Sequence, residues 1–191
     1  MQRHSAHAEN IVMVAHRLER LETEVVFTGG AIVGLLLTDI AAPDVRPTDD
    51  VAVIVGITRY FDYASLQEQL RKIGFKHDMN GPNCRFILDG LKVGVMPSEG
   101  KVLGFTNRWY DFALASANVY LMPDGTSIKL ISAPAFVATK LEAFHARGLG
   151  QSARCVRGQS FYLSEVLWCL YAKSSCRVDW SLLITELTQI K

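Results

Sequence analysis

Hydrophobic residues recur along the chain at two different spacings, and these spacings predict the order of helices and strands. Over residues 9–21 and 60–72, apolar positions recur three and four residues apart, which predicts amphipathic helices. Short apolar runs at 24–27 and 51–55 predict strands, and the apolar run at 31–37 predicts a buried helix. Because residues 51–55 are almost wholly apolar, we expect that strand to be covered on both faces.

Two Asp-Gly pairs predict hairpins in the middle of the chain, because this dipeptide favours tight turns between antiparallel strands. Further on, Pro134 predicts the first turn of a long helix, because proline is favoured there. The residues from 158 onward indicate two more helices. The two hairpins consist of runs 84–88 and 91–96 about Asp89-Gly90, and runs 119–121 and 127–131 about Asp124-Gly125.

This order of elements predicts an α/β fold, in which a mixed sheet is flanked by helices and followed by a helical C-terminal part. We expect residues 1–132 to form the α/β core with the second strand pair, and residues 133–191 to form the helical part packed on it. No linker rich in Pro, Gly or Ser separates the two, so the chain is expected to be one compact unit.

Composition narrows the function classes. The 191 residues are 49% hydrophobic and 20% charged, as in a soluble globular protein, and the net charge of +1 offers no general attraction for nucleic acid. The four cysteines form no Cys-x-x-Cys pair, which favours reduced thiols in a cytoplasm. The polar start and the lack of any apolar run near about 18 residues predict neither secretion nor membrane spanning.

A glycine pair marks the junction between the first predicted strand and the following helix. Thr28, Gly29 and Gly30 stand at this junction, where glycines let a phosphate approach backbone N–H groups closely. A plain tight turn is the alternative, and the pair taken alone favours it.

The second strand carries an acidic residue at its start. Side chains two positions apart share a face of a strand, so residues 50 and 52 point together while Asp49 points away. Two carboxylates on one face would hold a divalent metal between nucleotide phosphates. The sequence has Asp50 there, followed by Ala52, so part of this metal chemistry is missing.

In these segments the chain resembles bacterial nucleotidyltransferases of the DNA polymerase β superfamily, in particular the abortive-infection and toxin–antitoxin group. The resemblance implies their fold, with Mg²⁺ and a nucleoside triphosphate if the protein is active and no cofactor otherwise. It also implies an RNA, a protein or a small-molecule hydroxyl as acceptor, or an antitoxin as partner. The matching segments, in the family's order, are residues 26–30, 46–50, 84–86, 93–97, 103–110 and 133–144.

The resemblance also implies roles for individual residues. Asp50 would be both the catalytic carboxylate and the metal ligand. Lys140 would face the nucleotide phosphates, although a surface lysine without a role is an equally weighted alternative. Arg85 would reach a phosphate from the sheet, and the alternative is that it simply faces solvent from its strand. The residues expected to bind the nucleotide are Thr28, Gly29, Gly30, Thr48, Arg85 and Lys140.

The departures from the family pattern concern the metal. Family members carry an Asp-hydrophobic-Asp pair on the second strand and a third Asp on the strand that ends in Met-Pro. This chain has Asp50, Ala52 and Gly94 at those positions, so two of the three expected ligands are absent. A later acidic helix motif is also altered, with Tyr162 at the acidic place.

Nearby residues offer weak substitutes. Asp49 is on the wrong face, Asp89 falls in a predicted turn, and Glu99 follows the exit from a strand. Arg108 and Trp109 would stack a base or bind phosphate, but a salt-bridged arginine beside a buried tryptophan is the favoured reading.

Two functions remain open from sequence. The losses at 52 and 94 favour a catalytically impaired or inactive descendant that binds a nucleotide or a partner. The alternative is an active toxin-type nucleotidyltransferase that moves a nucleotide from a triphosphate to an RNA, protein or small-molecule hydroxyl.

Overall fold

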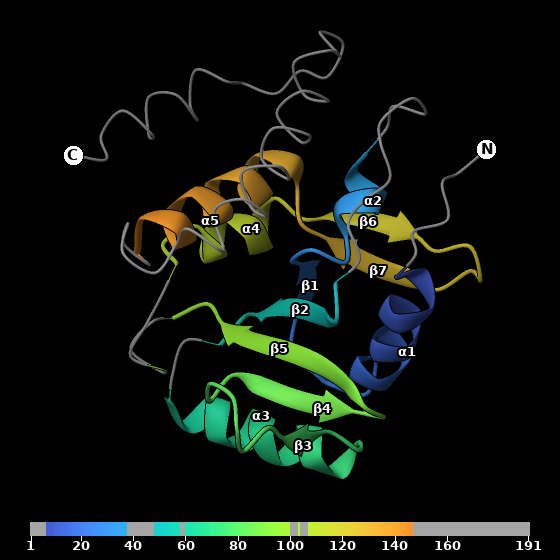
Figure 1. Cartoon of the computed structure of the whole chain (residues 1–191), viewed down its shortest axis with the longest axis vertical. Coiled ribbons are helices and arrows are strands. Elements are labelled where there is room, and N and C mark those ends of the chain that lie inside the picture. The colour runs from blue at the N-terminus through green and yellow to red at the C-terminus, as the bar shows by residue number, and fades with distance from the viewer. Residues whose placement is uncertain (1–6, 38–47, 58–59, 100–102, 104–106, 147–191) are drawn as a thin grey trace, which may run out of the picture.

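The structure is a computed structural model that describes residues 7–37, 48–57, 60–99, 103 and 107–146. These residues form a seven-stranded mixed sheet in the order β3-β4-β5-β2-β1-β7-β6, flanked by helices (Figure 1). The helices are α1 (Ala8–Leu18), α2 (Val33–Leu36), α3 (Tyr60–Lys72), α4 (Tyr110–Ala115) and α5 (Ala133–Ala146). The strands are β1 (Val25–Thr28), β2 (Asp50–Val55), β3 (Lys76–His77), β4 (Arg85–Leu88), β5 (Leu91–Pro97), β6 (Asn118–Leu121) and β7 (Ser127–Leu130).

The centre of the sheet mixes strand directions. Strand β1 pairs antiparallel with β2, and β2 pairs parallel with β5. On its other side β1 pairs parallel with β7, which brings the β6–β7 hairpin into the same sheet. The α/β prediction of a mixed sheet flanked by helices is therefore confirmed.

The two faces of the central strands differ in burial. One face of β2 and β5 consists of valines that are 0–1% exposed: Val51, Val53, Val55, Val93 and Val95. On the other face Asp50 and Lys92 are exposed, and Ala52 and Gly94 are only half-buried. The expectation that residues 51–55 are covered on both faces is wrong at Ala52, because one face is open at this end of β2.

Helices pack on both faces of the central strands. The Tyr110 hydroxyl of α4 lies 3.0 Å from the sulfur of Met96, so α4 packs over the far end of the open face. Helix α3 packs against β5, because the Tyr63 hydroxyl donates a hydrogen bond of 3.3 Å to the carbonyl of Val95. Helix α1 lies beside α3, since Arg17 of α1 donates a hydrogen bond of 3.3 Å to the carbonyl of Ile73, just after α3. Figure 1 shows α4 and α5 lying together, apart from α1 and α3.

Most predicted elements are present. Helix α3 matches residues 60–72, and Gly74, with φ +101°, follows its end. The expected buried helix at 31–37 is only the four-residue α2. Strand β3 and helix α4 were not predicted, because both are too short to show a period. The predicted helices after residue 158 lie outside the described residues, and no described helix has the length and apolar character to span a membrane.

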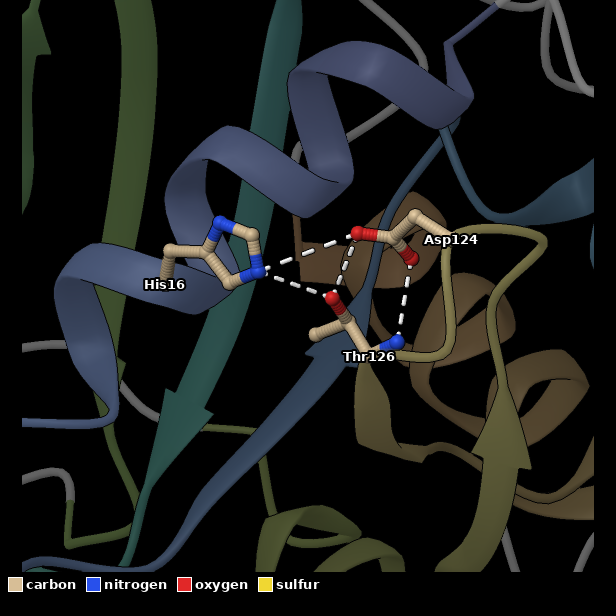
Figure 2. Close-up of polar contacts among 3 residues, drawn as sticks. All are labelled: His16, Asp124 and Thr126. Carbon is tan, nitrogen blue, oxygen red and sulfur yellow. Dashed lines mark hydrogen bonds and ion pairs between the residues drawn. The ribbon is translucent and has the colours of Figure 1, made fainter.

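A polar cluster joins α1 to the β6–β7 hairpin (Figure 2). The Thr126 hydroxyl donates to Asp124 Oδ2 at 2.6 Å, and the Thr126 backbone N–H donates to Oδ1 at 3.0 Å. Because Thr126 donates its only hydroxyl proton to Asp124, its oxygen accepts the third bond, and His16 Nε2, 2.8 Å from Thr126 Oγ1, is the donor. The hydroxyl bond from Thr126, then its backbone bond and a smaller attraction from His16, hold the pKa of the Asp124 carboxyl below its usual range.

Substituting Asp124→Asn is expected to lower the free energy of unfolding at neutral pH, with a difference from the wild type that shrinks in acid. The folded-state pKa is depressed, so the contribution of the carboxylate is complete above the unfolded value of about 3.9 and is lost as the pH falls through the folded value. Urea unfolding at neutral pH and at pH values below about 4 measures this. A difference that stays constant on acidification would contradict it.

Candidate functional site

The open face is organised by an in-register row of residues across four neighbouring strands. Thr28 pairs with Ala52, Ala52 with Gly94, and Gly94 with Arg85. Paired residues lie on the same face of a sheet, and so do residues two apart on a strand, which adds Asp50 to this face. The sheet thus brings the glycine turn, the acidic strand and the Met-Pro strand together.

The Gly29–Gly30 turn leaves β1 over this row. Gly29 has φ +87°, and a Cβ added to it would lie 2.9 Å from the Cβ of Ala52. A Cβ added to Gly30 would lie 3.4 Å from Thr48 Oγ1. The left-handed backbone and the close approach at Gly29 both require glycine. The turn therefore packs directly against β2.

Thr48 links the turn to Asp50. Its hydroxyl donates a short hydrogen bond to Asp50 Oδ1, and its backbone N–H donates to Nε2 of His7 at 3.3 Å. His7 is 6% exposed and directly precedes α1, so this helix helps to hold the segment that carries Thr48. Sequence reasoning missed His7, because its partner is 41 residues away and no local motif marks it.

Ala52 and Gly94, which we call the floor of the site, lie in register on β2 and β5 and carry no carboxylate. A Cβ added to Gly94 would meet only the Cβ of Ala52, at an ordinary 3.9 Å, so no described side chain fills the space above it. In the part of the chain that the structure describes, no group of three or more His, Cys, Asp or Glu residues gathers to hold a metal. Magnesium takes about six oxygen ligands in near-octahedral geometry. Asp50 and the Thr48 hydroxyl therefore do not fit a two-metal centre.

The three other described carboxylates named as substitutes from the sequence do not point onto the Ala52–Gly94 floor. Asp49 is exposed and lies just before β2. Asp89 lies in the β4–β5 turn and pairs with Arg17 of α1 at 3.4 Å. The Glu99 backbone N–H bonds to the carbonyl of Ile57, which places Glu99 beyond the end of β2 opposite to Asp50.

The two basic residues expected at the phosphates lie in different places. Arg85 is part of the row, beside Gly94, and its Nη1 lies 3.9 Å from Asp78 Oδ2. Lys140 lies on α5, with its Nζ 5.4 Å from the centre of the Phe136 ring. The sheet register therefore places Arg85 next to Gly94, whereas the position of Lys140 relative to Gly94 is set by α5.

Arg108 and Trp109 are engaged with their neighbours. Arg108 Nε lies 3.1 Å from Glu142 Oε2, and the guanidinium lies 5.2 Å from the centre of the Trp109 ring. These contacts join the start of α4 to α5. The prediction of a salt-bridged arginine agrees with these contacts, whereas Trp109, predicted to be buried, is only half-buried.

Cys84 is a buried free thiol next to Arg85. Burial raises the pKa of its thiol, and the protonated form is a poor nucleophile. This cysteine therefore packs in the core, and the thiol adds no chemistry to the open face.

Comparison with solved structures identifies the fold. The chain is similar to an antigenic nucleotidyltransferase-like protein from Paracoccidioides brasiliensis, with 17% identity, a TM-score of 0.54, and coverage of 95% of this chain and 93% of that one. Weaker similarities are to the lincosamide antibiotic adenylyltransferase LnuA with lincomycin bound (15% identity, TM-score 0.47, coverage 83% and 95%) and to ANT(2")-Ia with adenylyl-2"-tobramycin (11%, 0.49, 86% and 89%). No protein-family model and no curated protein matches the sequence. The fold is that of the nucleotidyltransferases.

Substituting Gly29→Ala is expected to destabilise the protein by about 2–4 kcal/mol, from left-handed backbone strain and from overpacking against Ala52. Gly125→Ala is the matched control: Gly125 has a similar φ of +91°, but a Cβ there meets nothing within 4 Å. Strain alone should cost about 1–2 kcal/mol at that position. Denaturant unfolding of both variants measures the difference, and equal losses would contradict the close seating of the turn on β2.

Proposed function

We propose that this protein binds a nucleotide on the open face of its sheet and transfers nucleotides weakly or not at all. The observation that carries the proposal is the direct pairing of Ala52 with Gly94 beside Asp50. The fold supplies the frame of a nucleotidyltransferase, while Asp50 lies beside an Ala52–Gly94 floor that itself carries no carboxylate.

The expected loss of activity follows from the chemistry of phosphoryl-type transfer. Positioning and charge neutralisation by metal ions supply nearly all of this catalysis. Removal of a group that only orients a metal ligand typically costs about 10–100-fold in affinity or activity. Loss of two direct ligands, at positions 52 and 94, removes the metal centre itself and is expected to cost more.

Binding is expected to persist because it depends on different groups. Gly29 and Gly30 turn over the row next to Thr48 and Asp50, where backbone N–H groups can approach a phosphate. Arg85 contributes a positive charge from the row itself. Lys140 is proposed to reach the phosphates from α5, and Thr28 to support the turn from β1.

The partner is the less defined part of the proposal. An RNA, a protein, a small-molecule hydroxyl or an antitoxin follows from the resemblance to abortive-infection and toxin–antitoxin enzymes, and nucleotide binding does not depend on that choice. An active toxin-type nucleotidyltransferase is the alternative function. Transfer of label from a nucleoside triphosphate by the unmodified chain with magnesium would establish it and overturn the proposal.

Restoring both carboxylates, as Ala52→Asp with Gly94→Asp, is expected to create magnesium-dependent nucleotide transfer. Gly94 is not among the glycines with positive φ, and a Cβ there makes only the 3.9 Å contact, so the strand can accept an aspartate. The two new carboxylates would lie beside Asp50 and repel one another until a metal binds. Magnesium should therefore also raise the melting temperature of the double variant.

The matched control is Ala52→Asn with Gly94→Asn, which has the same shape without the charge. It should show neither transfer nor a magnesium-dependent shift in melting temperature. A folded aspartate variant whose melting temperature rises with magnesium but which transfers nothing would show that the loss of function extends beyond the metal site. An aspartate variant that matches the asparagine control in both measurements would refute the assigned metal positions.

A further inference from the structure

We infer that the site holds the phosphates of its nucleotide with cationic side chains, and that it needs no divalent metal to do so. This inference rests on the proposed function and concerns how the same site neutralises its ligand. It starts from the mismatch between the residues of the open face and a magnesium centre.

The first cation is Lys92 of β5. It is the in-register partner of Asp50 across the β2–β5 pair, so both side chains leave the same face of the sheet from neighbouring strands. Lys92 is exposed, and it has no ion pair within the described residues. Its ammonium group is therefore available to a ligand over the Ala52–Gly94 floor, two residues further along both strands.

The second cation is Arg85 of β4, the in-register partner of Gly94. Its guanidinium approaches Asp78, but the separation of 3.9 Å is long for a hydrogen bond. The guanidinium keeps donors for a phosphate, which it binds in the bidentate geometry that arginine favours. Lys92 and Arg85 thus flank a floor that carries no side chain larger than a methyl group.

The charge balance of this face distinguishes it from a metal-dependent site. With carboxylates at 50, 52 and 94, the face would repel a polyphosphate until metal ions neutralised it. On the open face of β2, β5, β4 and β3, the described charged side chains are Asp50 against Lys92, Arg85 and Lys76, with Asp78 partly offsetting Arg85. The local charge is therefore positive before any ligand binds, which favours a nucleoside triphosphate without its magnesium.

The test is calorimetric titration of ATP into the full chain, once with EDTA and once with magnesium chloride. The dissociation constant in EDTA is expected to lie within about threefold of that in magnesium. Lys92→Ala should raise the constant in EDTA about tenfold. Lys72→Ala, at the exposed end of α3 against the opposite face of the sheet, is the matched control and should leave the constant unchanged.

The outcomes separate this inference from the proposed function. ATP binding that requires magnesium would overturn the inference and leave nucleotide binding in place, whereas no binding in either condition would overturn both. Equal affinities for Lys92→Ala and Lys72→Ala in EDTA would refute the role of Lys92. As a second variant, Ala52→Asp with Gly94→Asp should lose binding in EDTA and regain it with magnesium, and retained binding in EDTA would contradict the charge argument.

Discussion

The contact of Gly29 with Ala52 places every other group of the candidate site. Gly29 adopts a left-handed backbone, and a Cβ added to it would lie only 2.9 Å from the Cβ of Ala52. The turn therefore lies directly over β2. Gly30 then meets Thr48, whose hydroxyl bonds to Asp50. The atoms of residue 52 nearest to the turn are its Cβ, N and Cα, and an aspartate has all three. The frame of the site is therefore compatible with either residue, and loss of the carboxylate leaves it intact.

The alternation of side chains along β2 and β5 separates stability from chemistry. The valines at 51, 53, 55, 93 and 95 face the core, whereas Asp50, Ala52, Lys92 and Gly94 lie on the open face. Burial of each valine contributes about 1.5–3 kcal/mol, while residues on the open face contribute little to folding. Substitutions on the open face can thus change the chemistry of the site while leaving the valine core unchanged.

The charges on the open face differ from those of a metal-dependent active centre. An active centre built on three carboxylates is negative, and it depends on metal ions to accept a triphosphate. Here Lys92 and Arg85 stand in register beside Asp50 and Gly94, so the protein itself supplies positive charge. Under the proposed function this arrangement retains a nucleotide without transferring it, because cations on flexible side chains neutralise charge but do not align an attacking hydroxyl with the leaving group.

The sequence by itself determined the elements whose signals are local. The 60–72 periodicity predicted α3, Asp89-Gly90 predicted a hairpin, and the period of two placed residues 50 and 52 on one face. Tertiary structure alone decided the pairing of Ala52 with Gly94, the bond between His7 and Thr48, and the link from His16 to Thr126 across 110 residues. It also decided that one face of β2 is open at its Asp50–Ala52 end, because an apolar strand does not encode what packs over it. Short elements such as β3 and α4 form only where neighbours stabilise them, so their few residues carry no periodic signal.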